Sequence, residues 1–427
     1  MENETYKEKN SAVIHDKIII GGGAAGLMAA YSACKIRLDA GESPDVVLLE
    51  AGEVPGKKLA ATGNGKCNFT NLHQAKDCYR STDSEKAFRI VELFDHNEAI
   101  NFFKNLGILY TERNGYCYPY GEQAKTFRNV LLTRVASLGA VVETSKRVAG
   151  IEKDNGVYHL SCSDGSFYRC RKLVICAGGS ASPVFGSNGL IYEMLEEMGF
   201  NVIKPLPALC GLTSDYRFLK RIEGVRIKCM CSLYTKGSLK PIYQERGEIV
   251  FNKNGLSGIP VMNMSRFAIN EIRKGNKPRL SLDFFPDMDK KDLKNFMASL
   301  LNSSVVQIGD ALSALINDKL LKIMFVETRL KFDARSDLYD IKTLSYELGN
   351  LASIMKEFEI NITGDTGFEN AQATQGGVSL KEVNEKTMES YKYPGMYLAG
   401  EVLDVDGMCG GYNLQWAWTT GYIAGRS

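Results

Sequence analysis

The chain has 427 residues, which is enough for two or three domains of ordinary size and a large apolar core. It carries 52 lysines and arginines against 50 aspartates and glutamates, and the net charge of +2 gives no electrostatic reason to expect binding to nucleic acid or to an anionic membrane. The 11 cysteines include no C-x-x-C pair, which argues against a zinc ribbon or a thioredoxin-type dithiol, and we predict no metal site.

The N-terminal segment, MENETYKEKNSAVIHDK, is charged and lacks the apolar core of a secretory signal. No stretch of the chain approaches the roughly 18 uninterrupted apolar residues that a membrane span requires. Together with cysteines that show no disulfide framework, these features predict a cytoplasmic protein that acts on a small molecule, without a membrane or nucleic-acid partner. The sequence gives no indication of the oligomeric state.

The segment KIIIGGGAAGLMAA, residues 17–30, predicts a strand, a glycine turn and a helix. Gly21, Gly23 and Gly26 have the G-x-G-x-x-G spacing of dinucleotide-binding proteins. The first glycine would allow a tight turn, the second would let a pyrophosphate approach the backbone, and the third would let the helix pack closely on the strand. The phosphate charge would then lie at the positive end of the helix. Taken alone, the same spacing also suits a turn that serves only packing.

A second apolar strand, Val46–Leu49, ends in Glu50, 24 positions after Gly26. The usual spacing to the acidic residue that binds a ribose is about 20 positions. A carboxylate at this place predicts an unphosphorylated adenosine ribose, as in FAD or NAD. The alternative is a solvated carboxylate at the end of a strand, but the order of strand, glycine turn, helix, strand and acid favours dinucleotide binding.

Alternating strands and helices continue to about residue 199, including a predicted strand at 172–179. After Pro205 and Pro207 the pattern changes to short alternating segments with glycine turns, which predict antiparallel strands, and then to helical spacing. The last part of the chain returns to a buried strand, Met396–Ala399, and a helix from about Asn413. The sequence therefore predicts an α/β domain that an insertion interrupts.

Three longer segments resemble a known family: GKKLAATGNGKCNFTN (56–71), GEIVFNKNGLSG (247–258) and the stretch from Thr374 to Gly425. They are similar to segments of the bacterial FAD-dependent flavoproteins known as aminoacetone oxidases or 3-dehydro-bile-acid Δ(4,6)-reductases, and the resemblance extends from Lys17 to Gly425. It implies a flavoprotein of the two-dinucleotide-binding-domain type.

The resemblance also implies a fold: a Rossmann-like FAD-binding domain that is discontinuous in sequence, with an inserted β-barrel domain and a small helical subdomain. The change of pattern after Pro205 agrees with this arrangement. The expected boundaries are 13–200 and 356–427 for the FAD-binding domain, 201–265 and 330–355 for the β-barrel domain, and 266–329 for the helical subdomain.

The resemblance further implies which residues contact FAD. Lys57 and Lys58 would offer positive charge near the adenosine or the pyrophosphate, the backbone at Val148 would reach adenine, and Glu401 would bind the ribityl chain. The helix that opens at Asn413 would stabilise the negative charge that collects on the flavin pyrimidine on reduction. The full set of expected cofactor-binding residues is Gly21, Gly23, Ala24, Ala25, Gly26, Glu50, Ala51, Lys57, Lys58, Thr62, Gly65, Lys66, Cys67, Asn68, Val148, Ala177, Gly178, Gly400, Glu401, Gly411, Tyr412, Asn413 and Leu414.

A flavin accepts or gives hydride itself, so the protein needs few catalytic side chains beyond a source of protons. The candidate catalytic residues are Tyr412, Cys409 and Cys67, which lie in the segments that carry the resemblance. Tyr412 could donate a proton or orient a substrate carbonyl, whereas a buried cysteine more often serves only as a small apolar residue. The four histidines lie outside those segments, and we expect them to have surface or packing roles.

The chain has one G-x-G-x-x-G unit, so no separate nicotinamide-binding domain is predicted, and NADH or NADPH would reach the flavin only transiently. We predict an NAD(P)H-linked reductase of a C=C bond conjugated to a ketone in a steroid-like bile acid. One alternative is an amine oxidase of the aminoacetone type that produces hydrogen peroxide, and another is a flavin redox sensor without turnover. The near-neutral charge argues against a tRNA-modifying flavoprotein.

Overall fold

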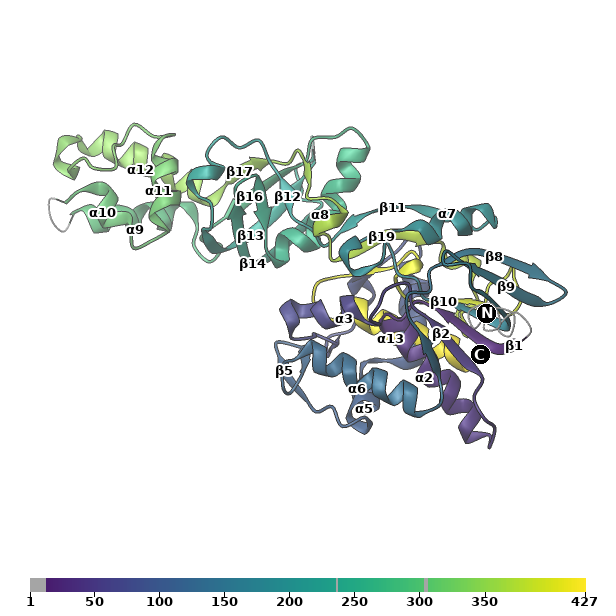
Figure 1. Cartoon of the computed structure of the whole chain (residues 1–427). Coiled ribbons are helices and arrows are strands. Elements are labelled where there is room, and N and C mark those ends of the chain that lie inside the picture. Colours follow the sequence, from purple (N-terminus) through teal and green to yellow (C-terminus); the bar gives the residue numbers. More distant parts are fainter. Residues whose placement is uncertain (1–12, 236, 303–305) are drawn as a thin grey trace. The chain divides into compact units, whose positions relative to one another are not determined.

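The computed structural model describes residues 13–235, 237–302 and 306–427, and the chain divides into two compact units (Figure 1). Unit 1 comprises residues 1–207 and 371–427, and unit 2 comprises residues 208–370. Most of the N-terminal segment that was examined for a secretory signal lies outside the described residues. The division of the insertion into a barrel and a helical subdomain, with the boundaries given above, stays a prediction.

A seven-stranded sheet forms the centre of unit 1, in the order β7-β2-β1-β10-β9-β8, and β20 also pairs with β10. Strands β2 and β20 and the second half of β1 are buried, as their continuous apolar sequences predict, whereas the parallel edge strand β7 is partly exposed. The α/β fold class with a Rossmann-type domain is therefore confirmed. The strands are β1 (Ile14–Ile20), β2 (Val46–Leu49), β7 (Val141–Glu143), β8 (Val148–Asp154), β9 (Val157–Cys162), β10 (Phe167–Ile175) and β20 (Met396–Leu398).

Helices and three smaller sheets complete unit 1. Its α-helices are α2 (Ala24–Asp39), α3 (Lys57–Ala61), α4 (Ser84–Val91), α5 (His96–Asn105), α6 (Ala124–Ser137), α7 (Leu190–Glu197) and α13 (Tyr412–Arg426). The smaller sheets pair β11 (Val202–Ala208) with β19 (Ala373–Val378), β4 (Tyr79–Arg80) with β21 (Asp406–Gly407), and β6 (Tyr116–Pro119) with both β3 (Thr70–Asn71) and β5 (Tyr110–Arg113).

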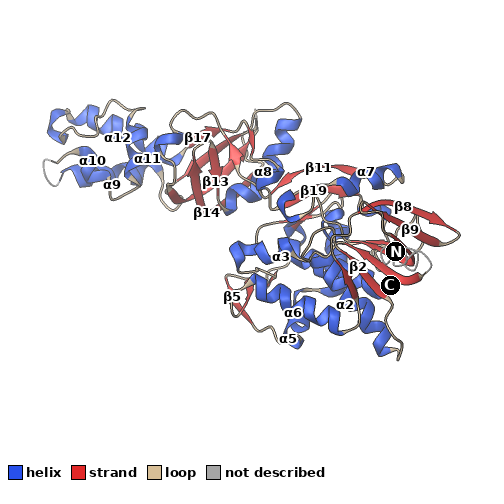
Figure 2. Cartoon of the chain, viewed as in Figure 1, coloured by secondary structure: helices blue, strands red, loops and turns tan. Residues whose placement is uncertain are grey.

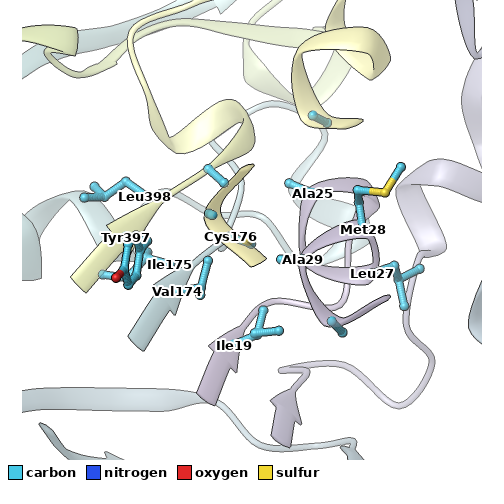
Figure 3. Close-up of a cluster of buried hydrophobic side chains, with 14 of the residues drawn as sticks. Ile19, Ala25, Leu27, Met28, Ala29, Val174, Ile175, Cys176, Tyr397 and Leu398 are labelled. Carbon is cyan, nitrogen blue, oxygen red and sulfur yellow. The ribbon is translucent and has the colours of Figure 1, made fainter. Parts of the chain in front are cut away.

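The C-terminal helix α13 packs directly against the N-terminal helix α2. A Cβ atom added at Gly421 would lie 2.3 Å from the carbonyl oxygen of Ala25, and one added at Gly425 would lie 2.3 Å from that of Ala29. The two backbones therefore touch, and the pairing of 421 with 25 and of 425 with 29 shows that the helices run parallel. Figure 3 shows the core beside this contact, in which Ala25 and Leu27 of α2 lie near Ile175 of β10 and Leu398 of β20.

Unit 2 contains a second seven-stranded sheet, which is antiparallel, in the order β17-β16-β13-β14-β15-β12-β18. The two end strands of this order, β17 and β18, belong to one segment, 358–365, which pairs with β16 through its first half and with β12 through its second half. The inserted β-barrel stays a prediction. The strands are β12 (Leu212–Thr213), β13 (Arg226–Tyr234), β14 (Tyr243–Asn252), β15 (Gly255–Ser257), β16 (Arg279–Asp283), β17 (Phe358–Asn361) and β18 (Gly364–Asp365).

Five α-helices lie in the described residues of unit 2, and α12 packs on α9. Figure 2 shows α9 to α12 gathered at one end of the unit 2 sheet. The helices are α8 (Ile259–Arg273), α9 (Lys290–Asn302), α10 (Ile308–Leu312), α11 (Asp318–Phe325) and α12 (Ile341–Lys356). Across the described residues of both units, no helix combines the length and the apolar character needed to cross a membrane.

Replacing Gly421 with alanine should lower the free energy of unfolding of unit 1 by about 1–3 kcal/mol, because the new Cβ would overlap the backbone of Ala25. Urea denaturation followed by tryptophan fluorescence measures this, since the two tryptophans, Trp416 and Trp418, both lie in α13. Gly349 of α12 is the matched control, because a Cβ there meets only the side chain of Lys294 at 3.7 Å. Circular dichroism should show that G349A is more stable by about 0.5–1 kcal/mol. A G421A protein as stable as the wild type would contradict the close packing.

Candidate cofactor site

The candidate cofactor-binding residues all lie in unit 1, and about half of them follow the carboxyl ends of adjacent parallel strands. Gly21 follows β1, Glu50 follows β2, Ala177 comes shortly after β10, and Gly400 comes shortly after β20. In open α/β sheets ligands bind at this edge. The fold therefore brings together residues that stand up to 379 positions apart in the sequence.

The glycine turn has the geometry that a diphosphate requires. A Cβ at Gly21 (φ +99°) would lie 2.4 Å from the carbonyl oxygen of Cys176, and one at Gly26 would lie 1.8 Å from that of Gly21. A Cβ at Gly23, in contrast, would have nothing within 4 Å. Gly23 precedes α2, and no side chain caps the amides of that helix, whose first residues are Ala24 and Ala25. The turn thus leaves open space at the positive end of a helix.

Glu50 is fixed facing this turn. Its Oε2 accepts a hydrogen bond from the amide of Gly22 at 2.8 Å, and its Oε1 accepts one from the amide of Gly52 at 2.6 Å. Each carboxylate oxygen keeps a second lone pair that a ribose hydroxyl could use. The amide of Lys146 donates to the Glu50 carbonyl, which places the segment leading to Val148, at the start of β8, beside Glu50 and the half-buried Ala51.

The two lysines of α3 diverge. The Nζ of Lys58 lies 2.8 Å from Oε2 of Glu401, whose other oxygen accepts from the amide of Thr374 at 2.8 Å. Lys57 is exposed, and its Nζ would lie 3.8 Å from a Cβ at Gly52. Lys57 is therefore on the side of Glu50, whereas Lys58 lies with Glu401, where we expected the ribityl chain rather than the adenosine.

The loop from Thr62 to Asn68 is conformationally strained. Asn64 (φ 53°) and Cys67 (φ 60°) adopt the left-handed conformation; asparagine takes it readily, whereas for Cys67 it costs about 1–3 kcal/mol. Strain of this kind is frequent at ligand-binding sites. Gly65 (φ +82°) faces open space, and Lys66 points to Glu122, with which it forms an ion pair at 2.8 Å.

Asn68 carries a buried oxygen without a partner. Its Oδ1 accepts no hydrogen bond from the residues that the structure describes, and it would lie 2.9 Å from a Cβ at Gly411, the residue before α13. No side chain caps the first amides of α13. The Asn413 side chain bonds instead to Gly407, donating to its carbonyl at 2.9 Å and accepting from its amide at 2.8 Å. A helix N-terminus and an acceptor that lacks a donor thus lie side by side, next to the half-buried Leu414.

The segments after β10 and β20 are held closely against the two parallel helices. Gly400 donates its amide to the hydroxyl of Thr420 at 2.9 Å and accepts from the indole of Trp416 at 3.0 Å, and a Cβ there would lie 2.8 Å from that of Ala25. Ala177 is half-buried, and Gly178 has a φ of +78°. These contacts fix the position of Glu401, the next residue along the chain.

Two of the three candidate proton donors, Tyr412 and Cys67, lie in surroundings that disfavour proton transfer to a substrate. Tyr412 donates its hydroxyl to the carbonyl of His73 at 2.9 Å, and burial raises the pKa of Tyr412. The thiol of Cys67 is completely buried, which raises its pKa to about 12 and keeps it protonated at neutral pH. Cys409 lies in the loop before α13 and is partly exposed.

Sequence reasoning missed two residues of this site. The hydroxyl of Thr374 accepts hydrogen bonds from the amides of Ser180 and Ala181, and its own amide holds Glu401. Its position at the start of the third segment with the family resemblance was the available signal. Arg128 of α6 lies buried behind the residues around Gly56, and no motif indicates it.

The arrangement fits FAD. The open space at Gly23 would take a diphosphate, the fixed carboxylate of Glu50 would bind the hydroxyls of the adenosine ribose, and the amides of α13 would face the flavin pyrimidine. The acceptor on Asn68 would find a donor on the bound flavin or on the ribityl chain. The contacts of individual residues with FAD stay predictions.

Comparison with known proteins gives a family and two kinds of relative. The family described as HI0933-like protein Rossmann domain matches residues 15–427. A 3-dehydro-bile acid delta(4,6)-reductase of Clostridium scindens is 32% identical over 410 residues, which cover 96% of this chain and 98% of that protein. A ribosomal RNA dihydrouridine synthase of Escherichia coli is 28% identical over 413 residues, with 96% and 97% covered.

Among solved structures, the open conformation of a flavocytochrome c3 fumarate reductase gives a TM-score of 0.48 at 14% identity. The match covers 100% of this chain and 80% of that one. This likeness is too distant to inform function.

Replacing Gly23 with valine should reduce FAD affinity by at least about 100-fold while the free energy of unfolding changes little. The backbone at Gly23 suits any residue and its Cβ has room, so the side chain would fill only the space for the diphosphate. Fluorescence titration with FAD measures the affinity. G121V, at another glycine with open surroundings, is the control and should bind FAD normally. Normal affinity in G23V would show that the diphosphate lies elsewhere.

The Cys67 thiol should stay unmodified by iodoacetamide at pH 8 until the protein unfolds, because burial leaves neither access nor thiolate. Peptide mass spectrometry after labelling with and without urea measures this. Labelling of Cys67 in the folded protein would contradict its place in the core and would favour a chemical role.

Proposed function

The chain belongs to the HI0933-like protein family and is an FAD-dependent oxidoreductase, and from this premise we propose that it reduces a C=C bond conjugated to a carbonyl group in a 3-oxo steroid acid of the bile-acid type. The observation that carries the substrate class is the identity with the Clostridium scindens reductase, which extends over nearly the full length of both chains.

The two kinds of relative support the same type of reaction. A Δ4 bond next to a 3-oxo group and the C5=C6 bond of uracil are both conjugated to a carbonyl, and their reduction adds one hydride and one proton across the double bond. Conjugation makes the carbon farther from the carbonyl electrophilic, so hydride goes to that carbon and a proton goes to the carbon beside the carbonyl. When FAD is bound, it supplies the hydride.

The residues of the chain would position the cofactor and favour its reduced form. The first amides of α13 would stabilise negative charge on the pyrimidine of the flavin. The Lys58–Glu401 pair would join α3 to the segment after β20 beside the ribityl chain. Of the three candidate proton donors, Cys409 is partly exposed, Tyr412 donates its hydroxyl to the carbonyl of His73, and Cys67 is buried.

A second candidate function is reduction of uridine in ribosomal RNA. The near-full-length match to the Escherichia coli synthase favours it. Against it stands the net charge of +2, since binding of RNA depends on many Lys and Arg contacts with phosphates. The steroid acid therefore stays the first choice, and the RNA becomes an outcome of the test.

We expect NADH or NADPH to bleach the bound flavin in anaerobic stopped-flow experiments. A 3-oxo-Δ4 bile acid should then restore the oxidised spectrum faster than air does. The saturated 3-oxo bile acid is the matched control and should leave the flavin reduced, because it has no conjugated double bond. Mass spectrometry should show two added hydrogens in the product.

Photoreduction of the flavin allows the oxidising substrate to be tested without knowing the physiological electron donor. If neither nicotinamide bleaches the flavin, light with EDTA as the electron source reduces it, and the acceptors are then compared. Reoxidation by unmodified ribosomal RNA but not by the enone would replace the steroid with the RNA. Rapid reaction with oxygen alone would contradict the proposal and favour an amine oxidase, and a flavin that no acceptor reoxidises would favour a sensor.

A further inference from the structure

Arg128 of α6 carries a buried positive charge that has one hydrogen bond to the backbone and no ion pair among the described residues. It is 8% exposed, and its Nη1 donates a hydrogen bond to the carbonyl of Pro55 at 2.9 Å. Its Nε is buried and has no acceptor among the described residues. In the part of the chain that the structure describes, no carboxylate forms an ion pair with Arg128 within 4.0 Å.

A guanidinium in this position is costly. Arginine is rarely this buried unless it is paired, and a buried charge without a partner destabilises a protein by several kcal/mol. An anion bound close to Arg128 would reduce this cost.

The surroundings of Arg128 point to the cofactor side of the molecule. A Cβ at Gly56 would lie 2.7 Å from Cγ of Arg128, so the arginine stem passes directly behind Gly56. Pro55 itself lies against the glycine turn, because a Cβ at Gly22 would lie 2.9 Å from Cβ of Pro55. Arg128 is thus separated from the glycine turn by one layer of residues.

The other cations near this corner are less suited to balance a buried anion. Lys58 is already paired with Glu401, and Lys57 is exposed to solvent, which weakens its field. Glu50, on the same side, adds negative charge. A dinucleotide diphosphate placed at the turn, next to the amides of α2, would therefore gain from additional positive charge behind the turn.

We infer that Arg128 is a positioning residue for the diphosphate of the bound dinucleotide. It holds the Pro55–Gly56 turn through its hydrogen bond, and its charge stabilises the diphosphate through the intervening layer without touching it. This inference rests on the proposed binding of FAD. Its physical content is that the charge, and not only the shape, of Arg128 contributes to affinity.

Calorimetry on the full chain freed of flavin tests the inference with ADP, which carries the diphosphate, and adenosine, which does not. R128Q keeps an N–H donor for Pro55 but removes the charge. It should weaken ADP binding by about tenfold and leave adenosine binding unchanged. R128K keeps the charge and should recover most of the ADP affinity. R134M is the matched control, because Arg134 is an exposed residue of the same helix, and it should bind both ligands normally.

Each result decides the matter. Equal loss of ADP and adenosine affinity in R128Q, without recovery in R128K, would show a purely structural role and overturn the inference. Unchanged ADP affinity in R128Q would also overturn it. If R128Q does not fold, R128K and R128M, which match the stem of arginine, provide the same comparison of charge at nearly constant shape. A wild-type chain that binds neither FAD nor ADP would instead overturn the proposed function.

Discussion

The backbone contact between α2 and α13 holds the two ends of the cofactor site in place. Gly421 and Gly425 let α13 contact the backbone of α2, the helix that follows the glycine turn, and the two helices run parallel. Gly421 lies nine positions after the first residue of α13, whereas Ala25 lies one position after the first residue of α2. The N-terminus of α13 therefore extends about 12 Å beyond that of α2 along their common direction. A diphosphate at α2 and a flavin ring at α13 need such an offset, because the ribityl chain separates them.

The same contact joins the two sequence segments that make up unit 1. Strand β20 joins the sheet beside β10, and α13 then packs along α2, so the C-terminal segment brings Glu401, Gly411 and the N-terminus of α13 to the candidate site that begins at Gly21. The insertion between them forms its own core. The parts of the site that would bind the adenosine and the flavin thus come from opposite ends of the sequence, and packing of small residues brings them together.

Features that depend on neighbouring residues could be predicted from the sequence. The buried strands at Val46–Leu49 and near Met396, and the helix near Asn413, follow from short apolar runs and glycine entries, and the α/β fold class follows from their order. Features that depend on distant partners could not be predicted. The pairing of 358–365 with both β16 and β12, the Lys58–Glu401 pair across 343 positions, and the burial of Arg128 all arise from packing between segments that carry no shared local signal.

The two carboxylates of the candidate site are oriented by the protein backbone. Glu50 and Glu401 are held by backbone amides, so each carboxylate has a fixed direction before any ligand arrives. Such preorganisation lowers the cost of binding, because no side chain must be ordered afterwards. The unpartnered Oδ1 of Asn68 and the first amides of α13 are the groups that remain for the flavin end.

The central claim is that unit 1 binds one FAD through these groups. Native mass spectrometry of the purified protein, with fragmentation of the released ligand, tests this claim most directly. We expect one non-covalently bound molecule per chain that fragments as FAD, and loss of that molecule in G23V. A chain that carries NAD, or that takes up no flavin when FAD is added, would contradict the account.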